Sequence, residues 1–110
     1  MKQILPSLKE KKRYLAYEVI SEKPIEKAII FKEIKAKTKE LIGLEGLAKA
    51  NITILDTFKD NKGVLKVNNK YLNHIRSSFI LIDNIDKNKT LIKTLGVSGT
   101  LKKVSRFIGG

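Results

Sequence analysis

Apolar and polar residues alternate first at 13–21, RYLAYEVIS. Leu15, Tyr17 and Val19 share one face of an extended strand, because successive side chains of a strand point to opposite sides. Tyr and Val also favour strands over helices. The pattern predicts a β-strand here, preceded by a short helical turn at 5–12.

The next segment changes from a period of two to helical spacing. From Ile25 to Ile42, apolar residues recur every three or four positions, with lysines between them. We expect a helix that has Ser21 as its candidate cap and ends at Gly43 and Gly46. The predicted buried stripe of this helix consists of Ile30, Phe31, Ile34, Thr38, Leu41 and Ile42.

A hairpin is predicted in the middle of the chain. One strand is centred on ITILDTF at 52–58, and the returning strand is GVLKVN at 63–68. The residues between them, KDNKG at 59–63, include the Asp, Asn and Gly that are typical of turns.

The last third of the chain predicts a helix, a strand and a final helix. The first runs over about 70–82 and is capped by Asn68 or Asn69, and the strand is TLIKTLGV at 90–97, after a polar connection. SGTLKKVSRFI then predicts a terminal helix. We expect the first helix to bury Tyr71, Leu72, Ile75, Ser78, Phe79 and Ile82, and the second to bury Leu101, Val104, Phe107 and Ile108.

This order of elements is that of the ferredoxin-like, or RRM-like, α/β sandwich. It predicts one domain over 1–110, with a four-stranded antiparallel sheet and two helices on one face. The terminal helix is expected to cover part of the other face or an end.

Charge is the strongest compositional signal. In 110 residues, 23 Lys and Arg face 11 Asp and Glu, which gives a net charge of +12. So basic a domain repels itself unless a polyanion neutralises it, and nucleic acid is favoured over an anionic membrane. Cysteine is absent, no apolar run is long enough to span a membrane, and no secretory leader is visible, so we expect a cytoplasmic location.

Catalytic chemistry is weakly indicated. His74 is the only histidine and lies on the polar side of its predicted helix, and the carboxylates are scattered without the spacing of a calcium loop or a two-metal nuclease. We therefore predict no catalytic residue and no metal site in the protein. A ferredoxin-like metabolic enzyme would need a small-molecule pocket and would not account for the charge.

The stretch GVSGTLK at 96–102 leaves two interpretations open. Gly96 and Gly99 permit positive φ, Ser98 and Thr100 are candidate caps, and amides at a helix start attract phosphate. The same residues also suit a tight joint between strand and helix. The strand at 63–68 has no aromatic residue, so base stacking of the RRM type is disfavoured, and recognition of phosphate, sugar and shape in structured RNA is expected.

Three stretches carry a family resemblance: LPSLKEKKRYLAYEVISE at 5–22, KGVLKVNNKYLNHIRSSFILI at 62–82 and IKTLGVSGTLKK at 92–103. They resemble the archaeal ribonuclease P protein component 2 family. The resemblance implies a subunit of ribonuclease P, the ribonucleoprotein endonuclease that removes 5′ leaders from precursor tRNA. It also implies that the catalytic centre lies on the RNA with Mg²⁺, that the protein itself binds no cofactor, and that it supports the catalytic domain of the RNA. A TIM-barrel subunit, protein component 3, is the implied partner in a two-plus-two heterotetramer.

RNA contacts are carried over residue by residue from this resemblance. A free-standing module that binds structured RNA or ribosomes is the alternative function. The predicted RNA-binding residues are Lys11, Lys12, Arg13, Lys70, Ser98, Gly99, Thr100, Lys102, Lys103 and Arg106.

Overall fold

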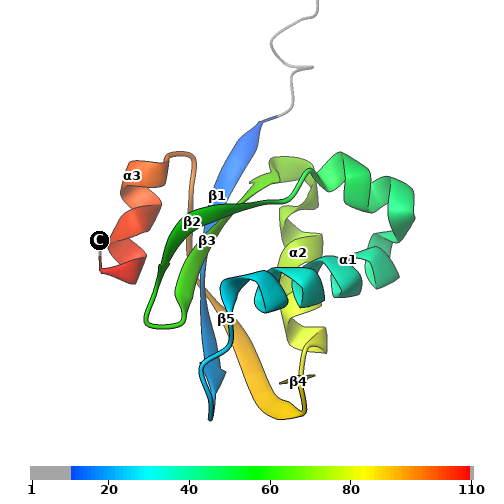
Figure 1. Ribbon diagram of the computed structural model, residues 1–110. Coiled ribbons are helices and arrows are strands. Elements are labelled where there is room, and N and C mark those ends of the chain that lie inside the picture. The colour runs from blue at the N-terminus through cyan, green and yellow to red at the C-terminus, as the bar shows by residue number, and fades with distance from the viewer. Residues whose placement is uncertain (1–10, 110) are drawn as a thin grey trace, which may run out of the picture.

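A five-stranded antiparallel sheet forms the centre of the molecule (Figure 1). The structure is a computed structural model that describes residues 11–109, and its sheet order is β2-β3-β1-β5-β4. The strands are β1 (Lys12–Ser21), β2 (Thr53–Lys59), β3 (Lys62–Asn68), β4 (Asn84–Ile85) and β5 (Asn88–Ser98). The helices are α1 (Lys27–Ala50), α2 (Leu72–Leu81) and α3 (Leu101–Val104), with 3₁₀ helices η2 (Asn69–Tyr71) and η3 (Ser105–Ile108).

The predicted ferredoxin-like arrangement is confirmed, and the sheet gains one short strand. Strand β4 lies inside the segment expected to be a polar connection and pairs with the start of β5. The turn between them consists of Asp86 and Lys87, both with positive φ. Two such residues match the twist of a tight hairpin, but Asp86-Lys87 is not the Asn-Gly or Asp-Gly pair that usually marks such a turn in a sequence.

One face of the sheet carries the main core. Leu15, Tyr17 and Val19 are buried together on this face, as the alternation predicts. Ile30 and Ile34 of α1 and the apolar stripe of α2 pack against them. Burial of this apolar area is the main stabilising contribution to the fold. The buried members of the α2 stripe and its end are Ile75, Ser78, Phe79 and Ile82.

Helix α3 and η3 cover part of the opposite face. Val104 and Ile108 pack on Ala16 and Val64 there. The expected burial of Leu101 and Phe107 is wrong, because their side chains are 40% and 46% exposed. The helical segment is short and tightens into η3, so only one narrow stripe, four residues apart, reaches the sheet.

The helix caps are partly as expected. Asn68 accepts a hydrogen bond from the Lys70 amide at 3.0 Å and confirms the predicted cap. The Ser21 cap is wrong: its hydroxyl donates to the Lys23 carbonyl, and α1 begins only at Lys27. Leu41, expected in the buried stripe of α1, is 42% exposed because the helix bends away two residues later.

Gly43 interrupts α1 with φ 76° and ψ 175°. The predicted helix end at this residue holds for the first helical segment, but the chain resumes helical geometry from Leu44 to Ala50. This region of backbone space is essentially restricted to glycine.

Gly43→Ala should lower the free energy of unfolding by about 1–3 kcal/mol through backbone strain alone, since a Cβ there would meet no atom within 4 Å. Urea denaturation followed by circular dichroism measures it. As a control, Lys39→Ala at an exposed position of the same helix should change stability by less than about 0.5 kcal/mol. Equal stability of Gly43→Ala and the native chain would contradict the positive φ.

Candidate nucleic-acid interface

Three separate segments of the chain meet at one end of the sheet. The start of β1 lies between the ends of β3 and β5: Lys12 is opposite Asn68, and Tyr14 is opposite Ser98. The Asn69 amide donates to the Lys11 carbonyl at 2.8 Å, which fixes the start of η2 beside β1. This strand register therefore gathers predicted RNA-binding residues that are far apart in the sequence.

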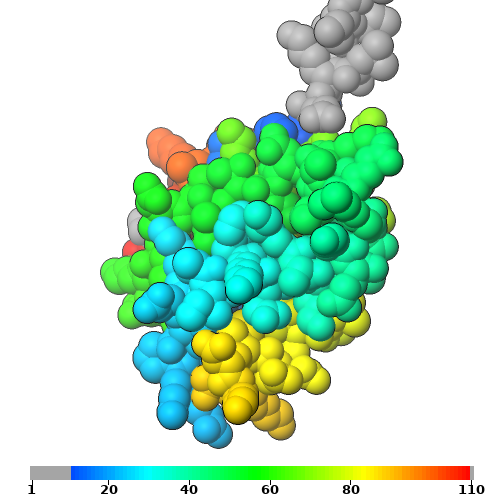
Figure 2. Space-filling model, turned by 45° about the vertical axis from the view of Figure 1, so that its right-hand side comes forward, coloured from blue at the N-terminus to red at the C-terminus, as the bar shows by residue number. Residues whose placement is uncertain are grey.

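We call this region the basic end. It carries side chains from the start of β1, from β3 and η2, and from α3. In Figures 1 and 2 the start of β1 and α3 lie at the upper end of the molecule, while the β4–β5 hairpin lies at the lower end. The basic end consists of Lys11, Lys12, Arg13, Lys66, Lys70, Lys102 and Lys103.

Lys66 is the one member that is not among the predicted RNA-binding residues. It lies in β3 directly opposite Tyr14, and so beside the start of β1. Its signal was the alternation of GVLKVN, which turns Lys66 away from the main core, but only the strand pairing places it near the other cations. Arg106, which was predicted, is exposed on η3 beyond α3.

The segments that build the basic end contain no carboxylate. Neither 11–17, 62–82 nor 87–109 includes an Asp or a Glu. Within residues 11–109, ion pairs instead hold Lys27, Lys37, Lys49 and Lys93 beside carboxylates elsewhere. In the same range no carboxylate lies within 4.0 Å of Lys70, Lys102 or Lys103, so their charge is available to an anionic ligand.

The turn between β5 and α3 is shaped by packing and by caps. The Ser98 hydroxyl accepts from the Thr100 amide at 3.2 Å, and the Thr100 hydroxyl accepts from the Lys103 amide at 3.3 Å. Thr100 is thus the predicted cap. These bonds fix the chain at the point where Lys102 and Lys103 leave the turn.

Packing requires glycine at one of the two positions in this turn, Gly96. Neither has positive φ, so the geometry that glycine would permit is not used. A Cβ on Gly96 would lie 2.4 Å from the Phe107 ring, which explains why no larger residue stands there. A Cβ on Gly99 would be 3.7 Å from Arg13 Nη1, which puts the guanidinium next to the turn. Phosphate contacts by Ser98, Gly99 and Thr100 stay a prediction.

The sheet face used by RNA-recognition motifs for base stacking is partly covered here. Ala16 and Val64 on that face are fully buried beneath Val104 and Ile108. Tyr14, the aromatic residue of β1 on this face, packs against the same cluster. The accessible chemistry of this region is therefore cationic, which suits backbone phosphate more than bases.

Within residues 11–109, we examined the one histidine and the grouping of possible metal ligands. His74 is exposed on α2, with its ring centroid 5.8 Å from that of Tyr71. In this part of the chain no three His, Cys, Asp or Glu side chains come together as a metal site would require. None of its helices is both long and apolar enough to cross a membrane.

Comparison with known proteins gives a consistent family. The model of the Rpp14/Pop5 family matches residues 13–109. Proteins named ribonuclease P protein component 2 from Methanosarcina mazei, Thermococcus gammatolerans and Pyrococcus furiosus are 35%, 34% and 34% identical to the chain. Each alignment covers 96% of this chain, and 90%, 88% and 88% of the respective relative.

A solved structure shares the fold. One chain of the cryo-EM structure of yeast ribonuclease MRP superposes with a TM-score of 0.67 at 15% sequence identity. The match covers 98% of this chain and 95% of the other. At this identity the similarity concerns the arrangement of strands and helices.

Proposed function

The chain belongs to the Rpp14/Pop5 family, and from that premise we propose that it is a protein subunit of ribonuclease P, the ribonucleoprotein endonuclease that removes 5′ leaders from precursor tRNA. In this proposal the basic end binds the catalytic domain of the RNA. The observation that carries the proposal is the gathering of cations from three chain segments, 11–17, 62–82 and 87–109, none of which contains an Asp or a Glu.

The proposed action is electrostatic. Folding an RNA crowds its phosphates together, and Lys and Arg side chains placed between them release counterions and reduce the repulsion. The rigid strand register holds Arg13 of β1 beside the turn that leads to Lys102 and Lys103. The cations are thus presented as a fixed set, which lowers the entropy lost on binding.

The hydrolytic step is assigned to the RNA. Mg²⁺ would activate water there and stabilise the leaving oxygen. Residues 11–109 hold no cluster of three His, Cys, Asp or Glu side chains that could bind this ion. The contribution of this chain is to bind and hold RNA.

A protein partner completes the proposal. We assign a TIM-barrel subunit, ribonuclease P protein component 3, as the partner, in a two-plus-two heterotetramer that acts on precursor tRNA in the cytoplasm. The family membership supports this choice. Large apolar side chains exposed away from the basic end, such as Leu44 at 68%, are available for protein contacts.

Reconstitution tests the function. The chain alone should cleave no precursor tRNA, and adding it with the TIM-barrel subunit to ribonuclease P RNA should raise the rate of 5′-leader removal or lower the Mg²⁺ concentration required. The rate is measured with labelled precursor tRNA across a magnesium titration, with RNA alone and RNA plus the partner alone as controls.

The outcomes separate the alternatives. Cleavage by the isolated chain would contradict a catalytic centre on the RNA. Tight binding to RNA without any effect on the rate would favour a free-standing structured-RNA-binding module instead.

A further inference from the structure

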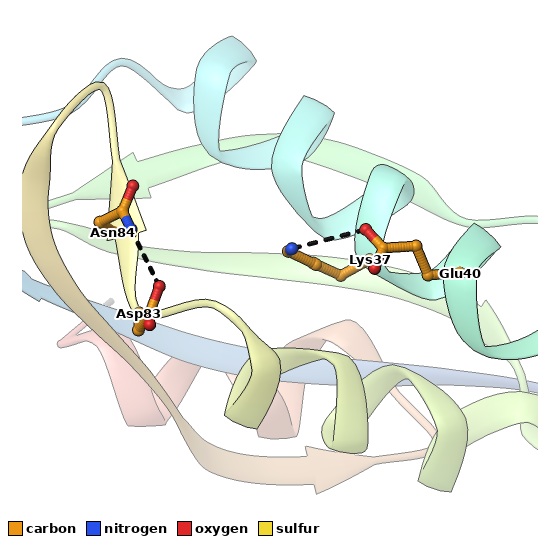
Figure 3. Close-up of polar contacts among 4 residues, drawn as sticks. All are labelled: Lys37, Glu40, Asp83 and Asn84. Atoms are coloured by element: carbon orange, nitrogen blue, oxygen red, sulfur yellow. Dashed lines mark hydrogen bonds and ion pairs between the residues drawn. The ribbon is translucent and has the colours of Figure 1, made fainter.

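Strand β5 is paired along its length on one side and only at its start on the other. It pairs with β1 over 90–98, whereas β4 pairs only with its first two residues. The Asp83 carbonyl extends this cover by one residue, because it accepts a hydrogen bond from the Thr90 amide at 3.0 Å. Asn84 Nδ2 donates in turn to the Asp83 carboxylate at 2.9 Å (Figure 3). Beyond Thr90, no other backbone group of the described part of the chain pairs with the outer side of β5.

The strand register shows which backbone groups point out of this edge. The Thr90 amide faces away from β1, since it donates on the β4 side. Backbone groups alternate in direction along a strand, so Ile92 and Thr94 also turn their N–H and C=O outward. Val19, which lies opposite Ile92, agrees with this, because its amide turns away from β5 and donates to the Asn61 carbonyl at 2.7 Å. Ile92 and Thr94 therefore present donors and acceptors to which no described residue offers a backbone partner.

A groove of about 550 Å³ runs beside these backbone groups, between β5 and α2. Residues 92–94 line it from β5, and Asn73, Arg76, Ser77 and Ile80 line it from α2. These four α2 residues are exposed, and they offer an amide, a guanidinium, a hydroxyl and an apolar surface. The open edge thus lies next to side chains that can select a ligand.

We propose that an extended acidic segment of a partner protein binds here as an added strand, pairing its backbone with Ile92 and Thr94. In this mode of recognition the main-chain hydrogen bonds supply affinity, and alternate side chains of the segment fill neighbouring pockets. An acidic side chain of the segment would meet Arg76, and an apolar one would pack on Ile80.

The alternation of donors and acceptors favours a peptide over a nucleic acid. Phosphate oxygens only accept hydrogen bonds, so a nucleic-acid backbone would leave the carbonyls of Ile92 and Thr94 unpaired and facing like partial charge. A peptide backbone supplies both kinds of group at the spacing of a strand.

The charge of the groove favours an acidic segment. Among residues 11–109, no carboxylate lies within 4.0 Å of Arg76. The segments that line the groove belong to 62–82 and 87–109, which contain no Asp or Glu. With a net charge of +12 on the whole chain, a carboxylate on the ligand is attracted to this groove both locally and at long range.

The edge at β5 is also the more regular of the two edges of the sheet. The other edge strand, β2, shifts its register with β3 between Ile54 and Phe58, and such irregularity makes a poor template for another strand. Over 90–94, β5 keeps one register with β1 and contains no proline. Lys93 does not cover the edge, because its Nζ lies 3.7 Å from the Glu18 carboxylate of β1, on the inner side.

Amide hydrogen exchange of the full chain, followed by NMR, tests the proposal. The probe is an acetylated hexapeptide of alternating glutamate and valine. In the free chain the amides of Ile92 and Thr94 should exchange faster than those of Leu91 and Lys93, which face β1. At a peptide concentration about ten times the dissociation constant, exchange at Ile92 and Thr94 should slow about tenfold. No slowing with the peptide at about 5 mM would overturn the proposal.

N-methylation of the peptide tests the backbone pairing and leaves the protein unchanged. One peptide is methylated at its glutamate amides and another at its valine amides, and only one of these two sets can face β5. One peptide should therefore lose about tenfold or more in affinity, and the other should bind like the parent peptide. Equal affinity of the two peptides would contradict strand addition.

Variants of the chain test the charge and the edge separately. Arg76→Glu should weaken peptide binding about tenfold, because it places a carboxylate beside the acidic segment. Lys39→Glu makes the same change of charge at an exposed position of α1 and should keep the affinity within about twofold. Thr94→Pro removes one outward N–H, which an edge strand tolerates, and should weaken binding while the circular dichroism spectrum is retained.

A nucleic acid at this edge would give a different result. An oligouridylate added in place of the peptide should leave the exchange of Ile92 and Thr94 unchanged. Protection of these two amides by the oligouridylate and not by the peptide would assign the edge to RNA and overturn the proposal.

Discussion

Replacing Arg13, Lys70 and Lys103 together with alanine is expected to reduce the affinity for ribonuclease P RNA about a hundredfold near physiological salt. The three side chains come from β1, η2 and α3, so the variant removes one cation from each segment of the basic end. Each lost phosphate contact lowers the salt slope by about 0.7–0.9, so three lost contacts lower it by about 2–3. The three corresponding factors of lost affinity multiply. Filter binding across a salt series gives both the affinity and the slope.

A matched variant separates the basic end from net charge. Lys32, Lys39 and Lys59 are exposed on α1 and β2, and their replacement with alanine removes the same three charges. This control should lose only a few-fold in affinity and keep its salt slope. An equal loss of RNA affinity in both variants would mean that binding depends on the total charge of the protein. The basic end would then not be a specific RNA-binding site. Both variants should keep their stability within about 0.5 kcal/mol per substitution.

The face assignments of the fold were predictable because the residues that set them are neighbours in the sequence. Alternation at 13–21 grouped Tyr17 with Leu15 and Val19 on one face, which the structure buries, and helical spacing placed Ile34 and Phe79 on buried stripes. The short strand β4 and the helical segment after Gly43 were missed, since both depend on backbone turns whose residues, Asp86 and Lys87 in one case, carry no strong local signal.

In the candidate site, too, the features set by neighbouring residues were predictable, and those set by contacts between distant segments were not. Local composition identified Lys102 and Lys103 as exposed cations and Thr100 as a cap. The position of Lys66 beside the start of β1 depends on strand pairing between distant segments, which composition does not report. The role of Gly96 depends on its contact with Phe107 of η3, which strand and helix patterns taken separately do not report.

The core contains a buried polar group, the hydroxyl of Tyr17. Its side chain is fully buried, its ring centroid lies 6.2 Å from that of Phe79, and its hydroxyl has no hydrogen-bond partner within residues 11–109. Burial raises the pKa of this hydroxyl, so it stays neutral. An unpaired buried hydroxyl costs about 1–3 kcal/mol, and Tyr17→Phe is therefore expected to stabilise the protein by about 1 kcal/mol.

Gly63→Ala should be the most destabilising of these substitutions, by about 3 kcal/mol, because it overpacks the same site. A Cβ on Gly63 would lie 2.5 Å from the Tyr17 hydroxyl and 2.7 Å from Cζ, and the buried ring has little room to move. In the Tyr17→Phe background the nearest clashing atom is gone, so the cost should fall by about 1 kcal/mol or more. Urea denaturation of the four proteins in this double-mutant cycle measures the coupling. Additive effects would show that the hydroxyl does not face Gly63, and a destabilising Tyr17→Phe would show that the hydroxyl is paired.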